Sequence, residues 1–135
     1  MSVVHDGDDT AHGPVAVRRN GPFRSDRELR NAGITAPILL LGEALPEQVS
    51  FLANHGIRAS VADIQSARAL SAAAQALNTT LKIHIKLDTG MGRLGFLHPG
   101  MVTQSPGEAA GIVQAGRISG LKGLDVEGAY THFAK

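Results

Sequence analysis

Short apolar runs alternate with helix-patterned segments along most of this chain, and this alternation limits the folds that it can adopt. The runs have the residues of buried strands and cover 38–41, 57–61, a stretch beginning at Leu81, and 124–131. Strands that are joined by helices pair in parallel through right-handed crossovers. The sequence therefore predicts an α/β fold, and by itself it leaves open whether the sheet is a barrel segment or doubly wound.

Capping signals divide the remaining sequence into four helices that alternate with these runs. A serine or aspartate cap, a proline in the first turn and a glycine or asparagine beyond the last turn mark helix ends. The expected starts and ends are Ser25 and Gly33, Pro46 and Gly56, Asp63 and Leu77, and Ser105 and Gly116. The sequence therefore predicts about four parallel strands with intervening helices.

The length of the chain is too small for a complete barrel. The chain has 135 residues, whereas an eight-stranded α/β barrel typically needs about 250. It is 43% hydrophobic and 19% charged with a net charge of +1, which describes a globular chain without a basic patch for nucleic acid. The absence of cysteine excludes disulfides and thiolate metal sites. No apolar run approaches the roughly 18 residues of a membrane helix, so we expect a cytoplasmic protein without a membrane partner.

A strand that ends in a glycine-rich loop carries the most informative side chains. Residues 83–88 alternate apolar with ionisable residues, so that His84, Lys86 and Asp88 share one face of the strand. Three glycines follow within residues 90–95, and glycine allows positive φ angles and close backbone approach. This pattern predicts a loop folded tightly around a ligand at the end of a central strand.

Two sequence strings resemble the alanine racemase family, whose members are pyridoxal-phosphate enzymes with a barrel domain followed by a β domain. The strings are K-L-D-T-G-M-G-R-L-G-F at residues 86–96 and Y-T-H-F-A at residues 130–134. Weaker matches are E-L-R-N-A-G-I at residues 28–34 and P-I-L-L-L-G at residues 37–42.

The resemblance implies a partial (β/α)8 TIM-type barrel over residues 25–135. The expected strands then correspond to strands three to six of the family barrel, with the ligand at their carboxyl ends. Residues 1–24 match nothing in the family, and we expect a flexible leader there.

The resemblance also implies roles for Lys86, Arg93 and His132. An inward-facing lysine is costly unless it is paired or modified, and the matching lysine of the family is often carbamylated and holds the arginine. Arg93 would hydrogen-bond the phenolic oxygen of the cofactor and help to place the substrate carboxylate, for which a guanidinium fork is well suited. His132 would lie beside the cofactor ring. We expect Met91 and Asp88 to shape the loop.

The two acid/base groups of the family's reaction have no counterpart in this sequence. The lysine that forms a Schiff base with pyridoxal phosphate stands in a V-K-A-N-A-Y-G-H-G-like string, which is absent. The other base is a tyrosine of the partner subunit's β domain, and the single tyrosine here, Tyr130, matches another position. The four lysines are Lys82, Lys86, Lys122 and Lys135.

Two hypotheses for function follow from these observations. The first is a truncated pyridoxal-phosphate-dependent alanine racemase, which interconverts L- and D-alanine for peptidoglycan synthesis but is inactive alone. The second is a non-catalytic half-barrel remnant, or a module that binds pyridoxal phosphate or associates through its open sheet edges. The resemblance implies a small amino-acid substrate and a homodimer, and a serine racemase of this family stays open. Four histidines lack metal-binding spacing and are expected at the surface: His5, His12, His55 and His98.

Overall fold

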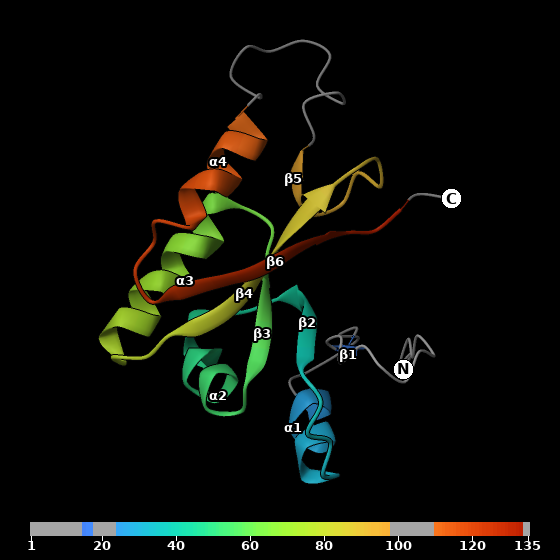
Figure 1. Ribbon diagram of the computed structural model, residues 1–135, viewed down its shortest axis with the longest axis vertical. Coiled ribbons are helices and arrows are strands. Elements are labelled where there is room, and N and C mark those ends of the chain that lie inside the picture. Colours follow the sequence, from blue (N-terminus) through green and yellow to red (C-terminus); the bar gives the residue numbers. More distant parts are fainter. Residues whose placement is uncertain (1–14, 18–23, 98–109, 134–135) are drawn as a thin grey trace.

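A parallel sheet of six strands organises the chain (Figure 1). The computed structural model describes residues 15–17, 24–97 and 110–133. The strands are β1 (Val15–Val17), β2 (Ile38–Glu43), β3 (Ile57–Val61), β4 (Leu81–Asp88), β5 (Phe96–Leu97) and β6 (Leu124–Thr131). Their order is β1-β2-β3-β4-β5, and β6 also pairs with β4. Because β1 and β6 pair with one strand each, the sheet is open, as a partial barrel requires.

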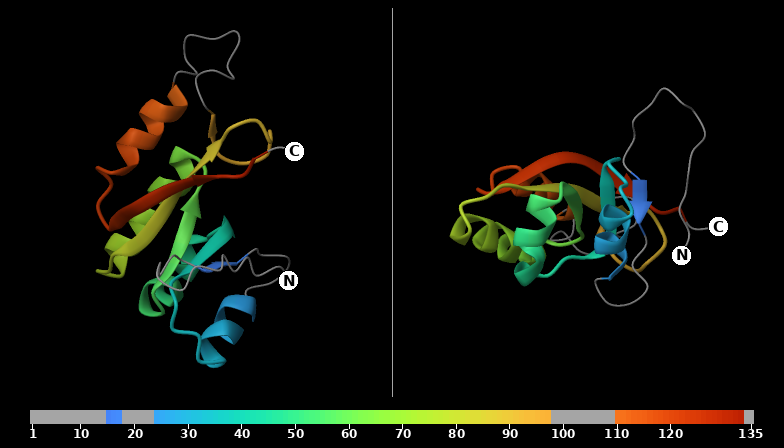
Figure 2. Two further views of the ribbon diagram at one scale, coloured as in Figure 1. Left: turned by 45° about the vertical axis from the view of Figure 1, so that its right-hand side comes forward. Right: turned by 90° about the horizontal axis from the view of Figure 1, so that it is seen from below.

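Helices α2, α3 and α4 lie against one face of this sheet (Figure 2). The helices are α1 (Arg24–Asn31), the 3-10 turn η1 (Pro46–Gln48), α2 (Val49–Asn54), α3 (Ile64–Ala76) and α4 (Ala110–Ile118). No helix in the described ranges combines the length and apolarity that crossing a bilayer demands. The opposite face of β3, β4 and β6 carries polar side chains.

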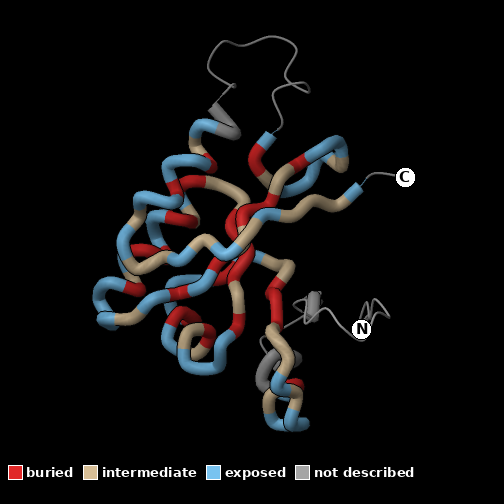
Figure 3. The backbone as a smooth tube through the Cα atoms, viewed as in Figure 1, coloured by how far each residue is buried: buried red, intermediate tan, exposed pale blue. Residues whose placement is uncertain are grey.

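The hydrophobic core fills the space between the sheet and these helices (Figure 3). Alternate residues of each strand face the helices, as the period of two predicts. In β4 these are Leu81, Ile83 and Ile85, all buried. On the helix side Leu52 of α2 and Leu70 of α3 are buried against them. Burying a side chain of this size contributes about 2 kcal/mol, so the core holds the polar face of β4 in a fixed register.

The four strands expected from the sequence are confirmed, and two more are present. The strands β1 and β5 were not predicted, because three and two residues are too short to show an alternation. The leader expected over residues 1–24 stays a prediction, although Val15–Val17 within it forms β1 and pairs with β2.

The helix signals are confirmed in part. Asp63 caps α3 as expected, because its carboxylate accepts the backbone N–H of Ser66 at 2.8 Å. The end expected at Gly116 is wrong, since α4 continues to Ile118. Ile118 is fully buried, and its packing outweighs the small helix propensity of glycine. The start expected at Ser105 lies outside the described residues.

Candidate active site

The carboxyl end of β4 brings two buried charged residues to the polar face of the sheet. Lys86 is 6% exposed and Asp88 is 5% exposed. They stand two residues apart, so both side chains project to the same side of the strand. Charged groups are seldom buried without compensation, and the two residues differ in the contacts that offset their burial.

The Asp88 carboxylate is compensated by the backbone of the loop that follows it, residues 89–95, which we call the β4–β5 loop. Oδ1 accepts the N–H of Gly90 at 2.9 Å and of Gly92 at 3.1 Å, and Oδ2 accepts the N–H of Arg93 at 3.1 Å. The bonds from Gly90 and Gly92, with that from Arg93, outweigh burial and lower the pKa of Asp88 from its ordinary value. The expected tight loop is present, and the group at its centre is a carboxylate of the protein.

Gly95 closes the β4–β5 loop against the strand from which it departs. Its φ is +137°, and a Cβ at this position would lie 2.7 Å from the backbone nitrogen of Asp88 and 2.8 Å from the carbonyl carbon of Leu87. Only glycine fits so close to backbone. The chain then forms β5, which pairs with the same two residues, Leu87 and Asp88.

The Lys86 ammonium has no such compensation. Across the described residues no hydrogen bond or ion pair to it is found. Burial lowers the pKa of Lys86, the positive charge of Arg93 lowers it further, and Asp88 acts in the opposite direction. A cavity of about 20 Å³ adjoins it, enough for a water molecule. The cavity is lined by Leu41, Gly42, Glu43, Ser60, Ala62, Asp63, Lys86 and Leu94.

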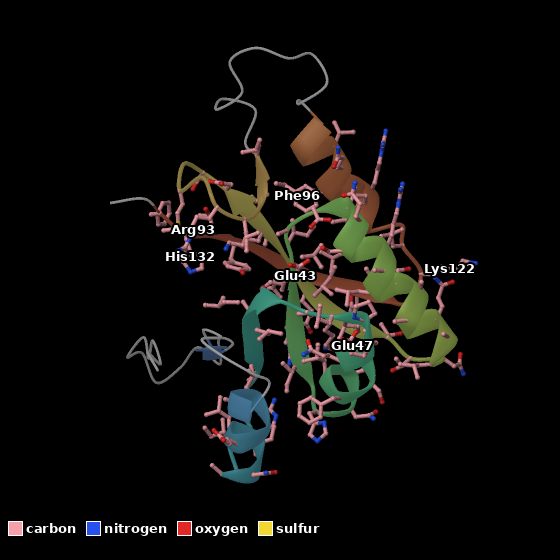
Figure 4. All side chains as sticks on the ribbon, turned by 180° about the vertical axis from the view of Figure 1, so that it is seen from behind. Glu43, Glu47, Arg93, Phe96, Lys122 and His132 are labelled. Carbon is pink, nitrogen blue, oxygen red and sulfur yellow. The ribbon has the colours of Figure 1, made fainter. Side chains whose placement is uncertain are left out.

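Arg93 and His132 lie close to each other (Figure 4), and Lys86, near the end of β4, is close enough to Arg93 for the arginine charge to lower its pKa. Arg93 is exposed on the β4–β5 loop, and the half-buried His132 follows β6 directly. The two segments are connected, since Thr89 Oγ1 and Thr131 Oγ1 form a hydrogen bond of 2.7 Å. The structure therefore brings together all three residues that the sequence singled out.

Tyr130 and Ser60 form a polar link that sequence reasoning missed. The Tyr130 hydroxyl and Ser60 Oγ are 2.8 Å apart, and Ser60 also donates to the carbonyl of Leu40. The pairing of β2 with β3 is irregular between Leu40 and Glu43, which leaves β2 carbonyls for side chains to bind. Burial raises the pKa of Tyr130, and its ring lies edge-on to that of His132 with centroids 5.7 Å apart. Only the Y-T-H-F-A string marked Tyr130, and nothing in the sequence marked Ser60.

A second polar cluster occupies the amino-terminal half of the same face. Glu127 is bound by Arg58, with Nε to Oε2 at 2.6 Å, and by Lys82. These two bonds lower the pKa of Glu127 to about 2. His84 Nε2 lies 4.0 Å from Glu127 Oε2, and burial lowers the pKa of His84 against the opposing effect of Glu127. Because Lys82 is bound to Glu127, its ammonium is held away from the carboxyl end of β4.

Comparison with known proteins identifies the family. The model of the alanine racemase N-terminal domain matches residues 16–135. An alanine racemase of Desulforamulus reducens is 40% identical over 108 residues, which are 80% of this chain and 27% of that relative. An alanine racemase structure from Clostridium difficile 630 has a TM-score of 0.71 at 30% identity and covers 89% of this chain and 28% of that one. A histidine racemase structure from Leuconostoc mesenteroides subsp. sake has a TM-score of 0.65 at 25% identity and covers 84% of this chain and 28% of that one. The chain thus spans a little over a quarter of the relatives that it matches.

Proposed function

Because this chain belongs to the alanine racemase family, we propose that it supplies Lys86, Arg93 and His132 to the active site of a pyridoxal-phosphate-dependent alanine racemase. Such an enzyme interconverts L- and D-alanine, the latter for peptidoglycan. The observation that carries the proposal is the common position of the three side chains at the carboxyl ends of β4 and β6. Barrel enzymes keep their chemistry at these strand ends.

The donor set at this edge suits an anionic aromatic cofactor. When bound, pyridoxal phosphate supplies an electron sink for the bond that breaks at the α-carbon. The Arg93 guanidinium offers several N–H donors for a phenolic oxygen and a substrate carboxylate. His132 offers a ring face beside them. These residues hold and orient the two molecules, and they leave the proton transfers to groups outside this set.

The lysines of the described ranges do not suit covalent attachment of the cofactor. Lys82 is held by Glu127, and Lys122 lies at the opposite edge of the sheet (Figure 4). Lys86 is buried beneath the edge. We infer that this chain alone does not racemise alanine, since a racemase needs two acid/base groups on opposite faces of the α-carbon.

The environment of Lys86 supports carbamylation of its side chain. A lowered pKa favours the neutral amine, whose nitrogen attacks the carbon of CO2 and loses one proton to water as the N–C bond forms. The product is an anion, which the positive charge of Arg93 would attract. The unmodified ammonium is instead repelled by Arg93. A carbon-13 NMR spectrum in ¹³C-bicarbonate tests this: a carbamate signal is expected in the wild type and not in Lys86→Arg. A wild-type spectrum without the signal would reject the modification.

The experiment for the proposed function is an absorbance titration with pyridoxal phosphate. Saturable binding that falls about tenfold or more in Arg93→Ala is expected, because a charge-assisted hydrogen bond is lost. Borohydride reduction and mass mapping then identify any lysine that reacts. The same affinity in Arg93→Ala and Arg68→Ala, an exposed arginine on α3, would contradict the proposed role of Arg93.

The open edges of the sheet favour a second candidate function, association of the half barrel without catalysis. Among the residues that the structure describes, β1 pairs with β2 alone and β6 with β4 alone, so each has one side without a described partner strand. Unpaired strand edges are templates for another strand. Sedimentation over a range of concentrations tests this candidate. A monomer at every concentration would contradict it, and the homodimer implied by the family is a separate prediction.

A further inference from the structure

The β4–β5 loop is folded around a buried anion that belongs to the protein. We propose that Asp88 is a positioning residue, which takes the place that a bound anion has in other glycine-rich loops and so leaves the Arg93 side chain as the loop's contact for an anionic ligand. This inference rests on the proposed function of Arg93.

The backbone donors of the β4–β5 loop are already occupied by Asp88. Gly90, Gly92 and Arg93 all direct their N–H groups at Asp88, over 2.9 to 3.1 Å. A backbone N–H that is already bound to a carboxylate is a poor donor to a second anion. A phosphate or carboxylate that reaches this loop therefore meets the exposed guanidinium of Arg93 and not the amides of Gly90 and Gly92.

The charge of Asp88 is stabilised by the backbone. The side chain is 5% exposed, and within the described ranges it forms no ion pair. Three backbone dipoles stabilise its charge. Replacing the carboxylate with an amide removes the acceptor for at least one of the three N–H groups, while the volume of the side chain stays nearly the same.

Asp88 is connected to both ligand-facing residues, Arg93 and His132. Oδ2 fixes the backbone of Arg93, and Thr89 ties the start of the loop to Thr131, the residue before His132. Asp88 stands directly before Thr89 in the chain. A loop that loses its central carboxylate is therefore expected to change the position of Arg93 relative to His132.

The test compares wild type, Asp88→Asn and Asp125→Asn by amide hydrogen exchange and nitrogen-15 NMR. Asp125 is exposed on β6, so its variant has the same charge change away from the loop. In Asp88→Asn the amide oxygen can keep the hydrogen bonds from the N–H groups of Gly90 and Gly92. The amide NH2 group then faces the N–H of Arg93, and two donors cannot form a hydrogen bond. We expect the Arg93 amide to exchange about tenfold faster or more, since a bond to a charged group is lost. Exchange in Asp125→Asn is expected to match wild type.

Pyridoxal phosphate is the ligand probe in the same samples. In wild type it is expected to shift the Arg93 Nε–H signal and to leave the Gly90 and Gly92 amides unchanged, and its affinity is expected to fall several-fold in Asp88→Asn. Glycine amides that shift as strongly as Arg93 would overturn the inference, and so would unchanged exchange in Asp88→Asn.

Failure of the proposed function is distinguishable from failure of this inference. If pyridoxal phosphate binds to none of the samples, the function proposed for this chain fails, while the exchange data still decide the role of Asp88. If Asp88→Asn does not fold, a pH titration of the wild-type protein, followed through its amide NMR signals, tests the role of Asp88. The three loop amides are then expected to titrate together with one pKa below that of an ordinary aspartate, and amides insensitive to acid would overturn the inference.

Discussion

Arg58 and Glu127 form a two-bond pair that connects β3 to β6 above the strand between them. Nε of Arg58 lies 2.6 Å from Oε2 of Glu127, and the terminal guanidinium nitrogen Nη2 lies 3.2 Å from Oε1. The pair is separated by 69 residues in the sequence. Such bidentate pairs are the stronger kind of ion pair, and this one fixes the two strands that carry Ser60 and Tyr130.

We expect the stability of the protein to depend on the ionisation of Glu127. Its pKa is lowered from 4.5 to about 2, so the pair contributes fully above pH 4.5 and is lost as the pH falls towards 2. The full shift corresponds to at most about 3 kcal/mol, and solvent screening at this partly exposed site reduces the contribution to about 1–2 kcal/mol. Urea unfolding between pH 6 and 2 measures it. Glu127→Gln is expected to show a flatter profile, and a slope equal to that of wild type would contradict this assignment.

Gly95→Ala is expected to disrupt the β4–β5 loop. The added methyl group would meet backbone atoms of Asp88 and Leu87 at 2.7 and 2.8 Å, which cannot move without breaking β4. We expect a loss of at least about 2 kcal/mol in the free energy of unfolding. Gly92→Ala is the matched control, because its φ is also positive but the space around it is open, and the expected loss is about 1 kcal/mol. Equal losses in the two variants would show that the close approach of Gly95 is unimportant.

Arg30→Lys is expected to loosen the packing of α1 on the end of α2. The guanidinium donates to the carbonyls of His55 at 3.0 Å, Ile34 at 2.6 Å and Ala36 at 2.8 Å. A lysine cannot reach this set with one ammonium, so we expect a loss of about 1.5–3 kcal/mol. Thermal unfolding is the measurement. Arg68→Lys on the exposed side of α3 is the control, and a similar change in both variants would refute the role of Arg30.

Asp63→Ala is expected to weaken the start of α3. The carboxylate accepts the Ser66 N–H at 2.8 Å and the Ser66 hydroxyl at 2.7 Å. Removal of such a cap lowers the free energy of unfolding by about 1 kcal/mol. Asp63→Asn is expected to retain most of the stabilisation, because its amide oxygen can still accept the Ser66 N–H. The comparison of the two variants by urea unfolding separates the cap from the charge, and equal losses would show that charge dominates.

Local sequence patterns were enough to predict the four longer strands and the importance of the β4 end. The alternation of residues 83–88 gave both the core face and the polar face, and the prediction that Asp88 shapes the loop agrees with its three backbone bonds. The roles of Arg93 and His132 toward a cofactor stay predictions, since they depend on a ligand.

Contacts that depend on the spatial arrangement of strands could not be predicted. Ser60 and Tyr130 are 70 residues apart, and they meet because β3 and β6 both flank β4. Serine and tyrosine in a strand carry no sign of such a partner. The strand β5 escaped prediction for a related reason: its two residues are ordered by Gly95 and by the end of β4, not by a pattern of their own.

The return of the β4–β5 loop to Leu87 and Asp88 has a thermodynamic consequence. A segment whose two ends are fixed on the same pair of residues has few conformations to lose when a ligand arrives, and preorganised sites bind at a smaller entropic cost. Differences in affinity among ligands of Arg93 are therefore expected to reflect the contacts that each one makes, because the backbone beneath the guanidinium is already in place.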